Sequence, residues 1–369
     1  MEQVEQVEQV EQVEQVEILM ATYNGAKYVA SQIESILAQD YQHILLTIFD
    51  DGSTDGTLRQ IEQYLSNSQV RIVGSERVGL PQVYFRLLGF LSPASHYAGY
   101  ADQDDVWLPG KVSRSLRMLR QAEDSRKDTA TTDATTSAGS ATTIAAPTTL
   151  SSSPLPVLYC SRSFITDSSL RVVGTTMLPR YPPSFSNALV QGIAAGSTML
   201  FNREAAELLA SWTPQFAPMH DWWTYLVISA TGKVIYDPLP TLLYRQHGAN
   251  ARGIMQNGRW SWRKRALWHF QEGARSSTRQ ATELREWLGD RKHLQGSGAH
   301  PDAAGPSMTP TPISPSSPSS PVVSAELDSF LNSQHDLPAR MRYALSGAAH
   351  RQRRVDDLVY RVLYLLGRI

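Results

Sequence analysis

Short apolar runs alternate with helix-like segments over the first third of the chain, and this alternation limits the fold more than any other feature. Four runs have the length and composition of strands: Ile18–Thr22, Ile44–Phe49, Val70–Gly74 and Tyr97–Ala101. Strands that alternate with helices predict an α/β fold with βαβ units, right-handed crossovers and a mostly parallel sheet flanked by helices. Ligands of such sheets bind beyond the carboxyl ends of the strands, so the residues after each run are the first candidates for a site.

Composition excludes several classes of function. The chain has 369 residues with 34 Lys and Arg against 35 Asp and Glu, a balance that argues against a nucleic-acid partner. Its single cysteine, Cys160, excludes an internal disulfide framework and leaves oxygen and imidazole ligands for any metal. We see no apolar stretch of about 18–20 residues and no secretory signal, and therefore expect a cytoplasmic protein.

Low-complexity stretches divide the chain. The Glu-Gln-Val repeats and the stretches rich in Thr, Ser, Ala and Pro cannot bury enough apolar surface to fold, which predicts a solvated arm and two disordered insertions. The expected parts are an arm over 1–15, the first half of the α/β domain over 16–122, a disordered insertion over 123–156, the second half of the domain over 157–255, a helical segment over 256–295, a Pro/Ser-rich linker over 296–323 and a basic C-terminal helical segment over 324–369.

Polar residues follow three of the predicted strands. Tyr23 follows the first, Asp51 follows the second, and the acidic segment Asp102–Asp105 follows the fourth. A tyrosine ring can stack on a nucleobase, and a carboxylate can accept a hydrogen bond from the imide N–H of uracil or thymine. Three carboxylates within four residues repel one another unless a cation neutralises them, and oxygen ligands suit Mg²⁺ or Mn²⁺ bound together with phosphates. Each motif taken alone is also compatible with an ordinary turn or helix cap.

Two further motifs lie in the middle of the chain. Asp221 stands between His220 and two tryptophans at a predicted helix start, where it can be a simple cap; the indoles can stack on a sugar ring or belong to the core. His247 and Arg245 follow a later apolar run, and these residue types bind metals and phosphates.

Taken in order, the segments ATYNG, DDGSTDGT, YADQDDVWLPGKV, AGSTMLFNRE, MHDWW and YRQHGAN resemble the family 2 glycosyltransferases of the GT-A fold, and in particular bacterial rhamnosyltransferase-like enzymes of surface polysaccharide synthesis. The resemblance covers about 16–255 apart from the Thr-rich insertion. It implies an inverting transfer of a sugar from a UDP- or dTDP-sugar, dTDP-rhamnose among them, to a saccharide or lipid-linked saccharide acceptor. It makes 16–122 the nucleotide-sugar-binding half and 157–255 the acceptor and catalytic half.

The resemblance also implies roles for individual residues. It assigns nucleotide contacts to Thr22, Tyr23, Asp51 and Asp102. It assigns a Mn²⁺ or Mg²⁺ ion to Asp104 and His247, with Asp104 the stronger ligand over its acidic neighbours, and the general base to Asp221. It leads us to expect substrate contacts from Trp222, Trp223 and Arg245. Relatives have an Asn-rich turn where this chain has Glu76-Arg77-Val78, so the contacts of that turn are not carried over.

One base and one metal suit a single displacement with inversion, whereas glycoside hydrolysis would need two carboxylates flanking the bond. Two other functions stay open. A phosphatase of the D-x-D type would place its nucleophilic Asp after the first strand, where this chain has ATYNG. A non-catalytic nucleotide-sugar-binding or membrane-surface scaffold would bind the ligand without transfer.

The segment 339–369 carries seven arginines against Asp356 and Asp357. Helical spacing also relates five apolar residues: Val355, Leu358, Val359, Val362 and Leu366. This pattern predicts a basic amphipathic helix, which either packs on the core or makes peripheral contact with an anionic membrane on its cytoplasmic face.

Overall fold

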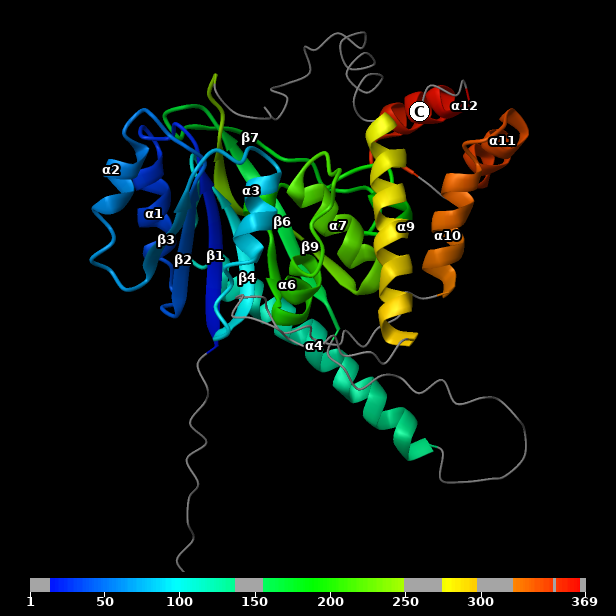
Figure 1. Ribbon diagram of the computed structural model, residues 1–369, viewed down its shortest axis with the longest axis horizontal. Helices are drawn as coiled ribbons and strands as arrows, with labels where there is room; N and C mark the ends of the chain where they lie inside the picture. The colour runs from blue at the N-terminus through cyan, green and yellow to red at the C-terminus, as the bar shows by residue number, and fades with distance from the viewer. Residues whose placement is uncertain (1–13, 137–154, 249–273, 297–320, 348–349, 366–369) are drawn as a thin grey trace, which may run out of the picture.

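The computed structural model describes residues 14–136, 155–248, 274–296, 321–347 and 350–365 (Figure 1). In these ranges the strands are β1 (Gln15–Thr22), β2 (Ile44–Asp50), β3 (Val70–Ser75), β4 (Ser95–Asp102), β5 (Val106–Trp107), β6 (Val157–Thr166), β7 (Val172–Thr175), β8 (Leu200–Asn202) and β9 (Lys233–Arg245). The helices are α1 (Val29–Leu37), α2 (Thr57–Glu62), α3 (Gln82–Leu88), α4 (Lys111–Thr136), α5 (Phe185–Ala188), α6 (Arg203–Ala210), α7 (His220–Thr231), α9 (Ala274–Gly296), α10 (Pro321–Asn332), α11 (Leu337–Ser346) and α12 (Arg354–Leu365).

The described strands form one sheet in the order β3-β2-β1-β4-β8-β6-β9-β5, with β7 paired to β6. The four predicted strands are present as β1 to β4 and pair in parallel. The long ladder between β6 and β9 is parallel as well, while β8, β5 and β7 add short antiparallel ladders. The predicted α/β class, with a mostly parallel sheet of the GT-A type and a C-terminal helical extension, is confirmed.

Helices cover both faces of the sheet because its central strands are apolar on both sides. In β1, Leu19 points into a core shared with α3, α6 and α7, whereas Ile18 and Met20 point into a second core shared with α1 and α4. Successive side chains of a strand face opposite ways, so one continuous apolar run supplies both cores. The result is a three-layer arrangement with β1 at its centre.

The register brings the predicted motifs to one edge of the sheet. Thr22 of β1 pairs with Asp50 of β2, and Ala21 pairs with Asp102 of β4. The three polar segments therefore leave the sheet side by side. Antiparallel pairing of Val106 in β5 with Leu243 in β9 then brings the end of β9 to the same edge.

Three boundaries differ from the predicted parts. Helix α4 continues to Thr136, beyond the expected start of an insertion at 123, because extending a formed helix costs far less than starting one. Helix α10 begins at Pro321, inside the expected linker, since proline suits the first turn of a helix. Strand β1 begins at Gln15, the last residue of the expected arm. The remainder of the arm and of both predicted disordered insertions, and residues 256–273 of the helical segment, lie outside the described residues.

A buried carboxylate ties the start of the sheet together. Glu17 in β1 is fully buried, and its Oε1 accepts hydrogen bonds from Thr47 Oγ1 at 2.5 Å and Arg71 Nη2 at 2.8 Å. Its Oε2 accepts from Ser92 N at 2.8 Å and Ser95 Oγ at 2.7 Å. The four donors come from different segments, so they depend on this one acceptor.

Replacing Glu17 with Ala should lower the free energy of unfolding by about 3–5 kcal/mol, because it leaves a buried arginine partner and three further donors without an acceptor. Urea denaturation measures the change. Glu62→Ala, at an exposed position of α2, is the control and should stay within about 0.5 kcal/mol of the wild type. Equal midpoints for the two variants would contradict the prediction.

Candidate active site

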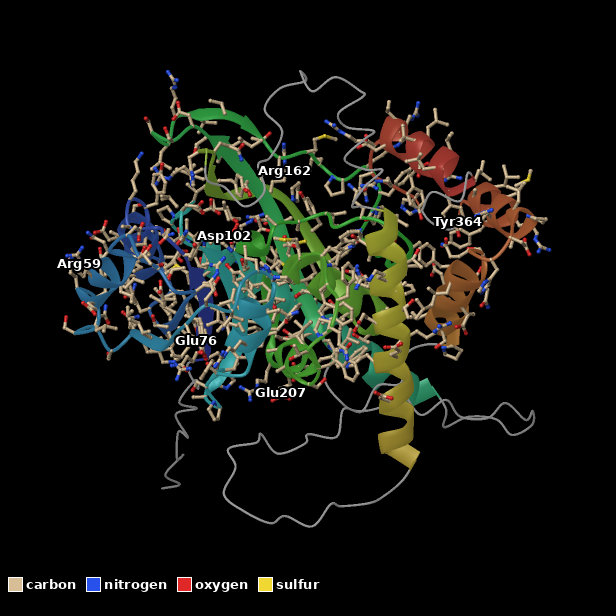
Figure 2. All side chains as sticks on the ribbon, turned by 45° about the horizontal axis from the view of Figure 1, so that its top comes forward. Arg59, Glu76, Asp102, Arg162, Glu207 and Tyr364 are labelled. Carbon is tan, nitrogen blue, oxygen red and sulfur yellow. The ribbon has the colours of Figure 1, made fainter. Side chains whose placement is uncertain are left out.

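The carboxyl ends of β1, β2 and β4 open into a cavity of 470 Å³. Six of the residues predicted from the sequence or adjoining them line it: Thr22, Tyr23, Asp51, Asp102, Asp104 and Asp221. A second cavity of 700 Å³ shares Tyr23 and Gln103 with the first and extends to Tyr28 and His247. Figure 2 shows Asp102 near the middle of the molecule, between the first and second halves of the sheet.

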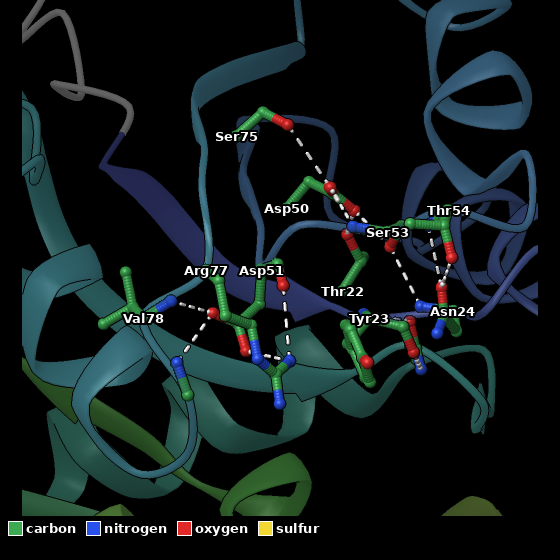
Figure 3. Close-up of polar contacts among 12 residues, drawn as sticks. Thr22, Tyr23, Asn24, Asp50, Asp51, Ser53, Thr54, Ser75, Arg77 and Val78 are labelled. Atoms are coloured by element: carbon green, nitrogen blue, oxygen red, sulfur yellow. Dashed lines mark hydrogen bonds and ion pairs between the residues drawn. The ribbon is translucent and has the colours of Figure 1, made fainter.

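Asp51 lies at the end of the cavity nearest β2, in a network that includes a residue the sequence analysis did not single out (Figure 3). Its Oδ1 accepts hydrogen bonds from the backbone N–H of Val78 at 2.5 Å and of Gly79 at 2.7 Å. Its Oδ2 pairs with Nη1 of Arg77 at 2.7 Å, and the Arg77 guanidinium lies 3.9 Å from the centroid of the half-exposed Tyr23 ring. A carboxylate has about four acceptor positions, so Asp51 keeps one for a ligand.

The neighbouring carboxylate, Asp50, has a different task. It accepts hydrogen bonds from Thr22 Oγ1 at 2.9 Å and from the N–H and hydroxyl of Ser53 at 2.8 and 2.6 Å (Figure 3). The Asn24 side chain accepts from Thr54 N at 2.9 Å in the same way. Asp50 thus fixes the turn after β2, while Asp51 faces the cavity.

Asp102 lies on the floor of the cavity. Burial raises its pKa to about 7, and the negative charge of Asp104 adds to the shift. The hydroxyl of Tyr84, in α3, donates to Asp102 Oδ1 at 3.0 Å. A cation at this position would relieve the repulsion between the carboxylates.

Asp105 is fully buried and does not line the cavity. Burial raises its pKa well above the ordinary value, and both acidic neighbours add to the effect. Its Oδ1 accepts from the backbone N–H of Arg245 at 3.1 Å, which links the acidic turn to the end of β9. Lys111 is buried near it, and burial lowers the pKa of this lysine to about 7.

Asp104 and His247 meet although 143 residues separate them. Asp104 Oδ2 lies 2.7 Å from His247 Nε2, and the two side chains are 15% and 12% exposed. The Tyr28 ring lies against the imidazole, with centroids 4.6 Å apart. Among the described residues no group of three or more metal-ligating side chains is present, so the protein would supply two ligands. This fits Mg²⁺ or Mn²⁺, which commonly take their other ligands from phosphates and water.

Arg245 makes its contacts with the protein, in contrast to the substrate contact expected of it. Its Nε donates to the carbonyl of Asp104 at 2.8 Å, Nη1 to the carbonyl of Ser168 at 3.0 Å, and Nη2 to Ser31 Oγ at 3.2 Å. The guanidinium also lies 4.7 Å from the centroid of Tyr28 and is nearly buried. These contacts hold the backbone of Asp104 in place.

Asp221 begins α7 on the side of the cavity formed by the second half of the chain. Its Oδ1 accepts from Trp222 N at 2.6 Å and its Oδ2 from Gly196 N at 3.2 Å. His220 stacks on Tyr84 with centroids 3.7 Å apart. A Cβ at Gly196 would lie 2.4 Å from His220 Nε2, so only glycine allows this close approach. These contacts orient the Asp221 carboxylate toward the same cavity as Asp104.

The two tryptophans after Asp221 belong to the core, which contradicts the prediction that they contact a sugar. Trp222 and Trp223 are only 8% and 1% exposed, and Trp222 Nε1 donates to the carbonyl of Ala188 at 2.7 Å. Neither lines the cavity. The physical reason is that α7 is buried on nearly every side, so its indoles face other parts of the protein.

Arg77 is the candidate site residue that the sequence analysis missed. The available signal was its position directly after β3, at the same edge of the sheet as Asp51. The unusual turn was noted there, but nothing in the sequence indicates that the guanidinium reaches back to Asp51 and Tyr23.

The sheet and the acidic cavity at its carboxyl edge define an α/β protein with a ligand site at the ends of parallel strands. Residues 17–144 match the family model Glycosyl transferase family 2, and this region is a domain of that family. The chain is 33% identical over 105 residues to the putative glycosyltransferase EpsE of Bacillus subtilis, covering 28% of this chain and 38% of that protein. It is 32% identical over 105 residues to the dTDP-rhamnosyl transferase RfbG of Shigella flexneri, covering 27% and 36%.

The chain spans about a third of the length of these curated relatives. Similar solved structures include S. aureus TarS 1-349 in complex with UDP-GlcNAc, with a TM-score of 0.47, 12% identity and coverage of 95% of this chain and 90% of that chain. Another is the mannosyltransferase PcManGT from Pyrobaculum calidifontis in complex with GDP-Man and Mn²⁺, with a TM-score of 0.42, 18% identity and coverage of 96% and 85%.

Proposed function

We propose that the protein is an inverting glycosyltransferase that moves a sugar from a UDP- or dTDP-sugar to a hydroxyl of a saccharide or lipid-linked saccharide. The carrying observation is that one cavity brings together Asp51, Asp104 and Asp221, three carboxylates suited to three different tasks. The family 2 domain supports this function, as do relatives named glycosyltransferases, one of them a dTDP-rhamnosyl transferase.

The nucleotide would bind at the ends of β1 and β2. The exposed Tyr23 ring offers a face for the base, and the remaining acceptor position of Asp51 suits the imide N–H of uracil or thymine. Arg77 can donate to a base carbonyl beside that N–H. Thr22 and Asp102, which line the same cavity, would contact the rest of the nucleotide.

Asp104 and His247 would hold the Mn²⁺ or Mg²⁺ ion, and Arg245 would position Asp104 through its carbonyl. A bound divalent ion neutralises the charge that the leaving diphosphate gains. The protein residues act around it: Arg245 and Asp105 fix the acidic turn to the end of β9, so that Asp104 keeps its place when the donor binds.

Asp221 would act as the general base. It takes the proton of the acceptor hydroxyl while the hydroxyl oxygen forms a bond to the anomeric carbon. The bond between that carbon and the diphosphate oxygen breaks on the opposite face, which inverts the configuration. The backbone N–H groups of Trp222 and Gly196 orient the carboxylate for this task.

The test is a screen of nucleotide-sugars for metal-dependent thermal stabilisation, followed by an assay of nucleoside diphosphate release with saccharide acceptors. Stabilisation and release with a UDP- or dTDP-sugar support the proposal. Release of phosphate from a simple phosphomonoester would indicate the phosphatase. Binding without transfer to any acceptor tested would indicate the scaffold.

Replacing Asp51 with Asn should weaken UDP binding roughly tenfold to a hundredfold, because hydrogen bonds to charged groups contribute about 1.5–3 kcal/mol. It should also narrow the preference for UDP over CDP, since an amide can donate to the unprotonated N3 of cytosine. Calorimetry with both nucleotides measures the two effects. Glu76→Gln, in the same loop but paired with Arg86, is the control. An unchanged UDP-to-CDP ratio would show that Asp51 does not contact the base.

A further inference from the structure

The three C-terminal helices form a small core of their own. Tyr364 of α12 packs against Phe330 of α10 and Tyr343 of α11, with ring centroids 6.4 and 5.5 Å apart, and against Tyr360 at 5.8 Å. Figure 2 shows Tyr364 among these helices, at the opposite end of the molecule from Arg59 of α2. The core uses one face of α11 and one face of α12, and leaves the opposite faces uncovered.

This small core is attached to the second half of the sheet domain. Gln352 N donates to Gln191 Oε1 at 2.9 Å, and Asn187 Nδ2 donates to the carbonyl of His350 at 2.8 Å. Gln352 Oε1 also accepts from the N–H of Tyr181 at 2.9 Å. Whatever the outer faces of α11 and α12 bind is therefore held beside the half of the domain that carries Asp221.

The outer face of α12 is apolar. Val355, Leu358 and Val362 are 70%, 63% and 47% exposed, and their spacing of three and four residues places them on one side of the helix. Tyr360 and Tyr364 are two residues further along and lie on the opposite, buried side. The packed-helix alternative is thus correct for the tyrosines but does not account for the valines and the leucine.

Helix α11 repeats the pattern. Leu337, Met341 and Leu345 are spaced four residues apart and are 50%, 46% and 78% exposed, opposite the buried Tyr343. Isolated exposed apolar residues are ordinary, but two stripes on neighbouring helices of the same small core indicate an interaction surface.

The charge around the stripes identifies the partner. The described residues of α11, α12 and their connection carry six arginines against two aspartates, of which Asp357 pairs with Arg361 at 2.9 Å. Arg342 and Arg354 are exposed and adjoin Met341 and Val355 in the sequence. A second copy of this chain would bring two basic faces together, which disfavours self-association, whereas an anionic surface would be attracted.

We propose that the stripes of α11 and α12 dock onto an anionic lipid surface, with the aliphatic side chains in the headgroup region and the arginines on lipid phosphates. This is the arrangement of an interfacial amphipathic helix. Among the described helices none is long and apolar enough to cross a membrane, so contact through this part of the chain lies along the surface. Docking would bring the catalytic half close to a lipid-linked acceptor, and does not depend on the transfer reaction.

Cosedimentation of the full chain with vesicles tests the proposal. Vesicles of phosphatidylcholine with about 30% phosphatidylglycerol should bind the protein at low ionic strength, and binding should weaken as salt screens the charges. The triple variant Val355→Asn, Leu358→Asn, Val362→Asn should lose at least roughly tenfold in partitioning, because each change removes apolar area from the interface. Val322→Asn, at a 71% exposed position of α10 outside the stripes, should bind as the wild type does.

Melting temperatures of all variants confirm that they are folded, since the altered residues are exposed. Arg342→Glu with Arg354→Glu is the second variant and should reduce binding to anionic vesicles and its salt dependence together. Three results would overturn the proposal: no binding of the wild type to anionic vesicles at low salt, equal binding by the triple variant, or a dimer in sedimentation velocity that the triple variant abolishes.

Discussion

Replacing Asp104 with Asn should abolish the metal dependence of nucleotide binding and reduce sugar transfer by roughly three orders of magnitude or more, since a catalytic ion supplies several kcal/mol. Asp104 is the acidic residue that both lines the cavity and contacts His247, at 2.7 Å. An amide keeps the shape of the side chain and removes the charge that would bind the ion. The diphosphate would then lack its counter-charge in the ground state as well as in the transition state.

Calorimetry of UDP binding with Mn²⁺ and with a chelator measures this effect. The wild type should bind UDP much more tightly with the metal, and Asp104→Asn should bind it weakly under both conditions. Asp328→Asn, at an exposed position of α10, is the control for loss of one negative charge. If the wild type binds UDP equally with chelator and with metal, the assignment of Asp104 and His247 as ligands is wrong.

Replacing Asp221 with Asn should reduce turnover by roughly 10²–10⁴-fold while the affinity for the donor stays nearly the same. The amide cannot accept the proton of the acceptor hydroxyl, and the cavity otherwise keeps its shape. One of the two backbone donors, Trp222 N or Gly196 N, loses a carboxylate acceptor, so a small drop in stability of about 1 kcal/mol accompanies the change.

Steady-state kinetics with varied donor and acceptor separates this variant from Asp104→Asn. A base variant loses kcat at an unchanged donor affinity, whereas a ligand variant loses donor affinity too. Asn187→Asp, a conservative change of a buried residue that contacts the small C-terminal core, controls for general disturbance near α7. Sugar transfer by Asp221→Asn at the wild-type rate would remove Asp221 from the mechanism.

Much of the fold could be predicted because the signals are local. The four apolar runs of the first half are long enough and regular enough to predict β1 to β4, and parallel pairing follows from the helices between them. The end of α4 was predicted less well, since Thr and Ala after 123 look like a linker by composition but continue a helix that Lys111 and its neighbours have already formed.

The candidate site divides in the same way. Carboxylates at strand ends are visible in the sequence, and parallel strands bring their ends together, so the cavity and its acidic character followed from the pattern. Trp222 and Trp223 were placed wrongly because a helix start gives no sign of which face the rest of the protein will cover. Arg245 presents the same problem, since its contacts come from Ser31 and Ser168, far away in the chain.

The order of the chain alone therefore sets which chemical groups reach the edge of the sheet, because strand length and polarity are properties of neighbouring residues. Folding decides which of two adjacent carboxylates faces the ligand. Asp50 turns inward to Thr22 while Asp51 faces the cavity, and Asp105 is drawn to the Arg245 backbone while Asp104 faces His247. Adjacent side chains point in different directions, and packing against segments more than a hundred residues away selects between them.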